Sequence, residues 1–357
     1  MFLRGIPVLP PGPAVAIAEV TKSLVTYRTI TPQYFHEIYR DAAASSKTSQ
    51  SDVWQDVFAV DQYGNLRPKH SVFSAIAAVP FYALFGNVGF WIMQQLFFLG
   101  LLFSTYLIVK QSTNRTLPWS TLLATLLLTQ SLFHCYSFSY DLHGCTLLIG
   151  GLCILKHFPM IGAAVMTLSI FVRPSFLLLV LPLALESMWG GERQKRARVV
   201  VGGAIIMLLF GAYNYYMWGS PLTTAYSRLP GFRDGAMILP PHPFGFDLQV
   251  FLSQWTDKLF SSTGLLPYNL SILALPLVVA SLYRERDFFR WVCLLSATGY
   301  SMYIFSYPMW DNTFHGNRFL LPAIYLYLLC FIPLIGKVET RHLSPMRSQE
   351  RDALPET

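Results

Sequence analysis

The stretch Val199–Trp218, VVVGGAIIMLLFGAYNYYMW, contains no Asp, Glu, Lys or Arg, although these four residue types make up 13% of the chain. At a rise of 1.5 Å per residue, about twenty apolar residues in a helix reach across the hydrocarbon core of a bilayer. The run Glu192–Arg198, which holds four lysine or arginine residues, precedes the stretch directly. Because Lys and Arg gather at the cytoplasmic end of a span, we predict a transmembrane helix that starts on the cytoplasmic side.

The same pattern recurs along the chain, and we therefore predict an all-α, polytopic membrane protein with about nine or ten membrane segments. The composition agrees with this fold class, since 53% of the residues are apolar and 15% are aromatic. Aromatic residues are enriched where Trp and Tyr lie at the two membrane interfaces. The apolar segments cover residues 72–86, 88–109, 118–138, 143–155, 159–172, 174–190, 199–218, 264–283, 291–307 and 318–336.

The formal net charge of +7 indicates membrane topology and not a nucleic-acid partner, because the positive residues lie beside the apolar segments. The five cysteines lie in apolar runs without the CxxC spacing of a zinc site. The positive positions are Lys110, Arg115, Lys156, Arg193–Arg198, Arg284–Arg290 and the tail after Lys337.

Alternating the spans outward from Glu192–Arg198 gives an expected topology. The loop 219–263 then lies outside, and every basic cluster lies inside. We predict three regions: an outer-face part over 1–70 with short amphipathic helices, a transmembrane domain over 71–336, and a polar cytoplasmic tail over 337–357. The short helices are expected over 14–27 and 33–40. The segment 72–86 reaches only about 22 Å as a helix, so we expect it to be re-entrant or half-crossing.

Four polar groups are expected to gather on the outer face. They are Gly64–His70, Tyr140–Gly144, Asn214–Tyr226 and Trp310–Arg318. Ionisable side chains at membrane depth are costly, so they mark a functional site or a buried pair.

Asp141 and Arg318 are the strongest examples of such side chains. Simpler roles stay open for both, since Arg318 can extend to lipid headgroups and Asp141 can cap a helix. Arg173, directly before Pro174, is either a packing or kink feature or part of the site. The sequence has no GxSxG, P-loop, HExxH or Rossmann motif, and a nucleotide is therefore not expected as the donor in a transfer reaction.

Taken together, five segments resemble the bacterial branch of the integral-membrane glycosyltransferases with the GT-C fold. That family includes protein O-mannosyltransferases and the aminoarabinose, galacturonosyl and arabinosyl transferases. The resemblance covers most of the chain and rests on the order of motifs that are each weak alone. The motifs are Asp61–Gly86 (DQYGNLRPKHSVFSAIAAVPFYALFG), Ser139–Gly144 (SYDLHG), Phe171–Pro174 (FVRP), Tyr213–Tyr226 (YNYYMWGSPLTTAY) and Trp310–Pro322 (WDNTFHGNRFLLP).

The resemblance implies a glycosyltransferase of hexosyl or pentosyl groups in the bacterial inner (plasma) membrane. Its donor would be a sugar linked to a polyprenyl phosphate, and its acceptor a glycan, a lipid or a protein on the outer face. Such chemistry needs a carboxylate that takes the acceptor's proton and cations that neutralise the departing lipid phosphate. Membrane lipids are further partners.

The resemblance also suggests roles for individual residues. Arg318 is the first candidate for the phosphate, because a guanidinium fork matches phosphate oxygens better than an ammonium. Asp141 is expected in a catalytic acidic role, orienting the acceptor or a divalent metal; no cofactor is certain and no metal ligand set is assigned. The other candidates are Lys69 as the second phosphate cation, His143 and His315 as hydrogen-bond donors, and Tyr226 on the acceptor side.

One departure from the family pattern concerns the catalytic base. The family carries an Asp in the first outer loop after a first span, and the matching stretch here, Gly12–Leu24, has Pro13 at that place with no span before it. Glu19 is one possible substitute, about two helical turns further along. The alternatives to an active transferase are a non-catalytic membrane partner, a transporter for lipid-linked saccharides, or an inactive truncated relic.

Overall fold

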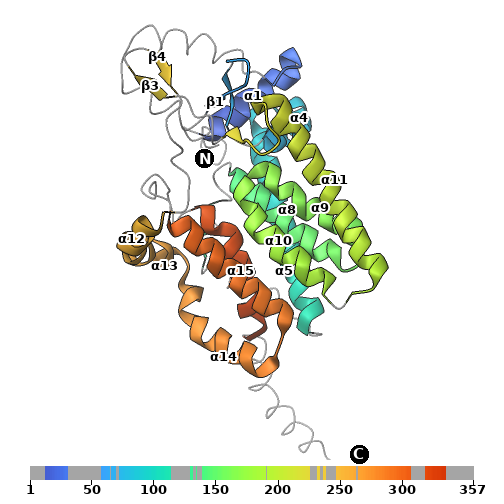
Figure 1. Cartoon of the computed structure of the whole chain (residues 1–357), viewed down its shortest axis with the longest axis vertical. Helices are drawn as coiled ribbons and strands as arrows, with labels where there is room; N and C mark the ends of the chain where they lie inside the picture. Colours follow the sequence, from blue (N-terminus) through green and yellow to red (C-terminus); the bar gives the residue numbers. More distant parts are fainter. Residues whose placement is uncertain are drawn as a thin grey trace, which may run out of the picture.

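The fold described here is that of a computed structural model, drawn whole in Figure 1. Among the residues that the structure describes it is all-α apart from two small hairpins, which confirms the all-α part of the predicted fold class. The residues that the structure describes are 13–30, 58–64, 66–69, 72–113, 129–131, 134, 139–189, 191–225, 231–233, 236–238, 247–262, 264–306 and 318–334.

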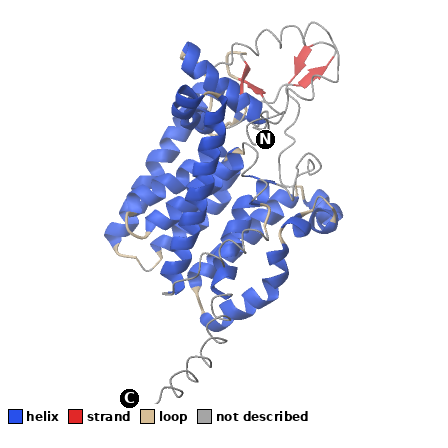
Figure 2. Cartoon of the chain, turned by 180° about the vertical axis from the view of Figure 1, so that it is seen from behind, coloured by secondary structure: helices blue, strands red, loops and turns tan. Residues whose placement is uncertain are grey.

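The N-terminal two thirds of the chain contribute a group of long and short helices that lie side by side (Figures 1 and 2). The predicted helix over 14–27 is confirmed as α1, whereas the one over 33–40 lies outside the described residues. The helices of this group are α1 (Pro13–Tyr27), α4 (Val72–Phe85), α5 (Asn87–Thr113), α8 (Tyr140–Leu155), α9 (Pro159–Val172), α10 (Leu177–Met188) and α11 (Arg193–Trp218), with the 3-10 turn η2 (Pro174–Phe176) before α10.

A second group of helices follows, and it packs against the first through α10 and α15. One apolar core joins the two groups, since buried residues of α5, α8, α9 and α10 contact buried residues of α14, α15 and the last helix. The second group consists of α12 (Leu248–Phe260), α13 (Leu265–Tyr268), η4 (Leu270–Ala274), α14 (Leu275–Glu285), α15 (Phe288–Phe305) and a last helix over Arg318–Leu334 that begins with η5 (Arg318–Leu320).

Within the described part of the chain, two helices are long and apolar enough to cross a membrane, Asn87–Gln111 of α5 and Arg193–Trp218. A third crossing results if Leu248–Tyr268 and Leu270–Glu285, which meet at a 99° bend, count as one broken span. The other apolar helices are shorter, among them α4 with 14 residues. The number of spans therefore stays a prediction, and most of the apolar segment 118–138 lies outside the described residues.

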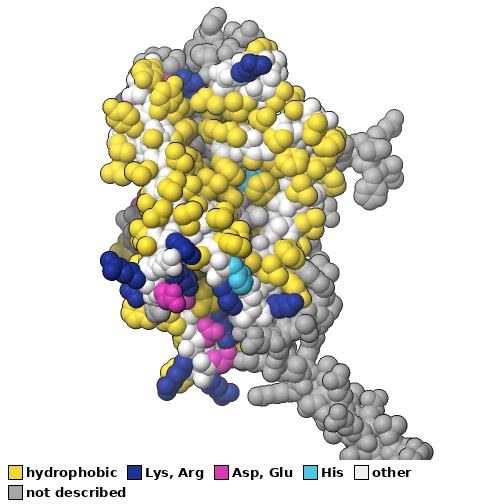
Figure 3. All heavy atoms as spheres, turned by 90° about the vertical axis from the view of Figure 1, so that its right-hand side faces the viewer, with side chains coloured by type: hydrophobic (Ala, Val, Ile, Leu, Met, Phe, Trp, Pro, Cys, Tyr) yellow, Lys and Arg dark blue, Asp and Glu magenta, His cyan; other side chains and the backbone are white. Residues whose placement is uncertain are grey.

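Helix α11 presents an apolar face to its surroundings. Only 17% of its most apolar window is buried, and Val200, Ile205 and Leu208 are exposed. Figure 3 shows the corresponding side of the molecule as a broad hydrophobic surface, with most charged side chains gathered at one end. An exposed apolar surface of this extent is typical of a membrane or protein contact, in agreement with the transmembrane helix predicted from Val199–Trp218.

Glycines set the closest helix contacts of the first group. A Cβ on Gly151 of α8 would lie 2.3 Å from the Met166 backbone nitrogen of α9, and one on Gly202 of α11 would lie 2.1 Å from the Met160 carbonyl oxygen. Small residues let helices approach this closely, which is how helices associate in membranes without a hydrophobic driving force. The α8–α9 and α9–α11 contacts therefore depend on the absence of side chains at these positions.

The first hairpin pairs β1 (Phe58–Val60) with β2 (Leu66–Pro68), and a turn that includes residues 61–64 lies between them. Asp61 stabilises it by accepting a hydrogen bond from the Tyr63 backbone nitrogen at 2.8 Å and by pairing with Arg67 at 2.9 Å. The backbone nitrogen of Gln62 donates to the Met217 carbonyl at 3.0 Å. The hairpin is thus fixed to the end of α11.

A second hairpin pairs β3 (Gly231–Arg233) with β4 (Ala236–Ile238).

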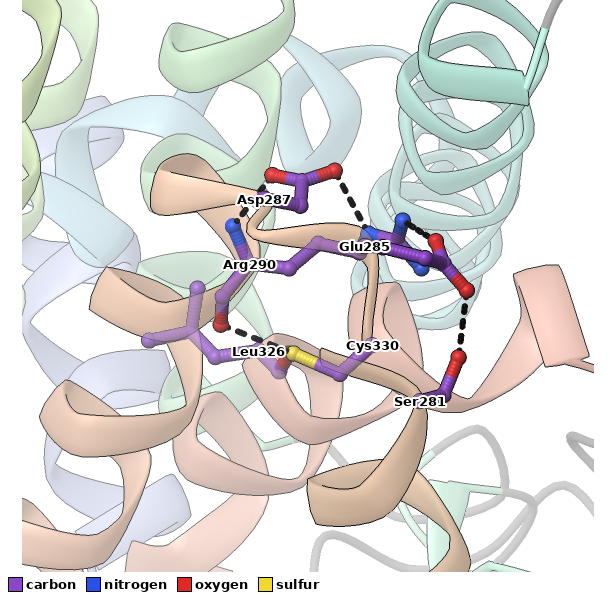
Figure 4. Close-up of polar contacts among 6 residues, drawn as sticks. All are labelled: Ser281, Glu285, Asp287, Arg290, Leu326 and Cys330. Carbon is purple, nitrogen blue, oxygen red and sulfur yellow. Dashed lines mark hydrogen bonds and ion pairs between the residues drawn. The ribbon is translucent and has the colours of Figure 1, made fainter. Parts of the chain in front are cut away.

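The corner between α14 and α15 is held by charge pairs (Figure 4). Arg290 is buried and contacts both Asp287, at 2.7 Å, and Glu285. The Cys330 thiol of the last helix donates to the Arg290 carbonyl oxygen at 3.2 Å. Part of the basic run 284–290 therefore stabilises a turn, in addition to its expected topological role.

We expect Gly151→Ala to destabilise the protein by about 1–3 kcal/mol, because the added Cβ cannot avoid the α9 backbone. The matched control is Gly150→Ala, whose Cβ would lie 3.6 Å from the Ser104 hydroxyl and which should leave stability nearly unchanged. Thermal unfolding of the detergent-solubilised chain measures both effects. Equal unfolding temperatures for the two variants would contradict the close contact.

The predicted orientation of α11 can be tested by cysteine labelling at its two ends. Leu222, which is 91% exposed, follows the helix, and Gln194 lies exposed in its first turn. In intact cells a membrane-impermeant maleimide should label Leu222→Cys but reach Gln194→Cys only after permeabilisation, since the basic end is expected inside. The opposite labelling pattern would reverse the topology.

Candidate functional site

The carboxylate of Asp141 lies between two arginines from distant parts of the chain. Its Oδ1 is 3.0 Å from the Arg173 Nε, and its Oδ2 is 3.5 Å from the Arg318 Nε. Asp141 is 1% exposed and Arg173 is also buried, whereas 30% of the Arg318 side chain is exposed. The sequence-predicted pair Asp141 and Arg318 is thus brought together, and Arg173 joins it as a third member.

The local structure explains why Asp141 and Arg173 meet. Helices α8 and α9 have similar lengths, 16 and 14 residues, and are joined by a turn of three residues. The start of α8 therefore lies beside the end of α9. Asp141 is in the first turn of α8, where the helix dipole favours a negative charge, but its side chain does not cap the helix.

Pro174 determines where α9 ends. A proline disfavours helical geometry in the residue before it, and Arg173 accordingly has an extended backbone with φ −153° and ψ 119°. The packing role considered for Arg173 and its place in the site are therefore compatible. The change of backbone direction places its guanidinium at the start of α8.

Aromatic rings surround the two guanidinium groups. Arg173 donates a hydrogen bond to the Tyr140 hydroxyl at 3.0 Å, and its guanidinium carbon is 3.8 Å from the centre of the Phe319 ring. The Arg318 guanidinium carbon is 5.5 Å from the Tyr140 ring and 5.4 Å from the Phe319 ring. These distances are typical of cation–π contacts, which stabilise a cation in partly dry surroundings.

Among the residues that the structure describes, the charges of this cluster do not cancel. Two arginines and one carboxylate leave one net positive charge, and the exposed member is Arg318. None of the described residues donates a hydrogen bond to either Asp141 oxygen, so the contacts are charge pairs and not aligned hydrogen bonds. The cluster can bind an anion through Arg318. Both Asp141 oxygens already face an arginine, so this carboxylate is not directed at a substrate.

Lys69 lies in a neighbouring pocket and not among the described contacts of Asp141. It follows β2, is 7% exposed, and lines a cavity of about 40 Å³. The cavity wall includes Val172 and Pro174, which flank Arg173 in the chain, so the pocket and the charge cluster share the α9–η2 junction. The remaining lining residues are Val72, Phe171, Phe210, Tyr213, Asn214, Trp218, Thr224 and Ala225.

His143 is fully buried inside the first helix group. Its Nδ1 lies 3.0 Å from the Ser74 hydroxyl of α4, and its Nε2 lies 2.9 Å from the Gln94 amide oxygen of α5. Both ring nitrogens thus have partners within the protein. This geometry does not favour the role that we predicted for His143 from the sequence, which was to donate a hydrogen bond to the lipid phosphate.

The remaining predicted residues are not joined to the cluster by the described structure. His315 and Tyr226 lie outside the described residues, although Thr224 and Ala225 line the Lys69 pocket. Glu19, the possible substitute base, pairs with Lys22 at 2.6 Å on α1. The described part of the chain holds no group of three or more His, Cys, Asp or Glu side chains that could bind a metal, and a metal role for Asp141 stays a prediction.

Arg173 is the site member that sequence reasoning left undecided. The signal was present, because an arginine directly before a proline ends the second of two apolar segments of similar length. Such segments form an antiparallel pair, and the end of the second then meets the start of the first. This reasoning places Arg173 beside Asp141 without any knowledge of the fold.

Removing the charge of Asp141 should be costly. Asp141→Asn leaves two arginines unbalanced at a buried position, and breaking a buried pair in this way costs about 3–5 kcal/mol. Arg173→Met in the same chain should recover part of the loss. Thermal unfolding in detergent measures both effects.

The matched control is Glu19→Gln, because the Glu19–Lys22 pair is partly exposed and such pairs contribute about 0–1 kcal/mol. An Asp141→Asn variant as stable as Glu19→Gln would show that the two arginines do not depend on the carboxylate.

The chain matches no known protein-family model, no curated protein and no solved structure. The glycosyltransferase resemblance therefore rests on the sequence motifs named above.

Proposed function

We propose that the chain is a membrane glycosyltransferase that transfers a sugar from a polyprenyl-phosphate donor to an acceptor on the outer face of the membrane. The observation that carries this proposal is the convergence of the motif segments. Segments 139–144, 171–174 and 310–322 supply Asp141, Arg173 and Arg318, which form one net-positive cluster. Segments 61–86, 171–174 and 213–226 supply the pocket that contains Lys69.

In the proposed reaction an acceptor hydroxyl attacks the anomeric carbon of the sugar. The bond between that carbon and the phosphate oxygen breaks, and the lipid phosphate leaves with an additional negative charge. Arg318 is the proposed group that stabilises this charge, since a preorganised cation at the site of developing charge lowers the barrier. The hydroxyl proton goes to a carboxylate base that is not among the residues of the cluster.

Asp141 and Arg173 have supporting roles in this proposal. Asp141 holds Arg318 in place through charge attraction, and Arg173 balances Asp141 within the buried part of the cluster. This arrangement leaves the partly exposed guanidinium of Arg318 directed by its neighbours but not neutralised by them. Lys69, at the other side of the α9–η2 junction, is the proposed second cation for the donor headgroup.

The proposal also includes the detailed arrangement of the helices in the membrane. It is a GT-C-like arrangement of about nine or ten membrane segments in a bacterial plasma membrane. Two helices of spanning length and the apolar face of α11 support it. The shorter apolar helices, α4, α8, α9 and α10, would cross only part of the bilayer or lean against the longer ones.

Arg318→Ala should lower sugar transfer by about 10²–10³-fold, because it removes the group that stabilises the leaving phosphate. Arg318→Lys should fall between that variant and the unmodified chain, since a lysine keeps the charge but not the fork. The measurement is consumption of undecaprenyl-phosphate-linked hexoses and pentoses by the chain reconstituted in liposomes.

Arg193→Ala is the control, because Arg193 is an exposed arginine at the far end of α11, and its activity should equal that of the unmodified chain. Movement of intact donor across the liposome membrane without sugar release would indicate a transporter. An Arg318→Ala variant with full transfer would overturn the assignment of the site.

A further inference from the structure

The interior of the first helix group contains a chain of polar contacts that the proposed reaction does not use. It joins Ser74 of α4, His143 of α8 and Gln94 of α5, and the Gln94 amide nitrogen donates to the His134 carbonyl at 2.5 Å. All of these side chains are buried, with exposed fractions of 5% or less. Polar groups in such a place cost free energy unless they are paired, and ionisable ones at membrane depth usually have a function.

The chemistry of the partners gives these contacts a direction. A carbonyl only accepts, so the Gln94 amide nitrogen faces His134 and the Gln94 amide oxygen faces His143. That oxygen also only accepts, and His143 therefore donates from Nε2. Its Nδ1 is then the acceptor for the Ser74 hydroxyl. A neutral His143 with its proton on Nε2 satisfies both contacts. Turning the ring over would move both nitrogens away from their partners and break both hydrogen bonds.

Two members of this chain of polar contacts, Ser74 and His143, lie close in sequence to residues of the proposed site. Ser74 is five residues after Lys69, at the start of α4, and His143 is two residues after Asp141, in the first turns of α8. The buried face of α4 otherwise consists of small side chains, Ala75 and Ala78. Small side chains allow close approach but do little to fix how far one helix has moved along another, whereas a directional hydrogen bond fixes this position.

We infer that His143 is a positioning residue, which holds α4 at one register against α5 and α8 and so fixes Lys69 relative to Asp141 and Arg318. The inference rests on the proposed function, because the distance between these cations matters only if one headgroup contacts both. His143 acts through Ser74 and Gln94 and does not contact the donor. A headgroup with a phosphate is the ligand that a spaced pair of a lysine and an arginine recognises.

The experiment is a double-mutant cycle on binding of undecaprenyl phosphate to the full chain in detergent. His143→Phe, which keeps the size of the ring but removes both hydrogen bonds, should weaken binding about tenfold, the effect of losing about one well-placed contact. Lys69→Ala should weaken binding to a similar extent. The Lys69→Ala/His143→Phe double variant should bind no more weakly than Lys69→Ala alone, because both changes remove the same interaction.

Two further variants separate positioning from folding. Ser74→Ala adds no bulk and should also weaken binding without adding to the effect of Lys69→Ala, while His143→Gln, which keeps a donor and an acceptor, should restore most of the affinity. His157→Phe is the control, since His157 lies exposed in the α8–α9 turn. Two results would overturn the inference but leave the proposed function standing. One is that the losses of His143→Phe and Lys69→Ala add in the double variant; the other is that His143→Phe binds normally while Lys69→Ala is impaired. Normal binding in both Lys69→Ala and Arg318→Ala would overturn the proposed function and the inference with it.

Discussion

The contact on which the site depends is the buried carboxylate of Asp141 between Arg173 and Arg318. An ionised carboxylate without a partner is very unfavourable in an apolar bundle, so its position requires that the start of α8, the end of α9 and the start of the last helix come together. The three described side chains carry one net positive charge, and Arg318 is the one that is partly exposed. The cluster is therefore a candidate site for an anion.

A small number of specific contacts also determines how the helices of the first group are positioned against one another. Its helices are apolar nearly all round, and apolar contacts alone specify relative position weakly. Specificity comes instead from close glycine contacts at Gly151 and Gly202 and from buried polar pairs such as Ser74 with His143. These features fix the relative positions of α4, α5, α8 and α9. Asp141 lies on α8, and Lys69 lies shortly before α4. The hairpin at residues 58–68 adds to this by fixing the chain before Lys69 to the end of α11.

Much of the fold class and part of the site could be predicted from the sequence. The uncharged stretch 199–218 is a local feature, and it forms a helix where one was expected. Asp141 and Arg318 stood out because ionisable side chains at membrane depth are costly, and the two are indeed in contact. The role of His143 was not predictable in this way, since its partners come from helices 69 and 49 residues away in the chain.

The sequence by itself determined the apolar, helical character of the protein, the end of α9 at Arg173 and the small set of charges that need a partner. These properties follow from composition, from the effect of a proline on the preceding residue, and from the cost of burying charge. Only the tertiary structure decided which charges pair and which side chains face each other. Pairing depends on the register of helices that are far apart in sequence, and that register is set by packing against neighbours that no local pattern reveals.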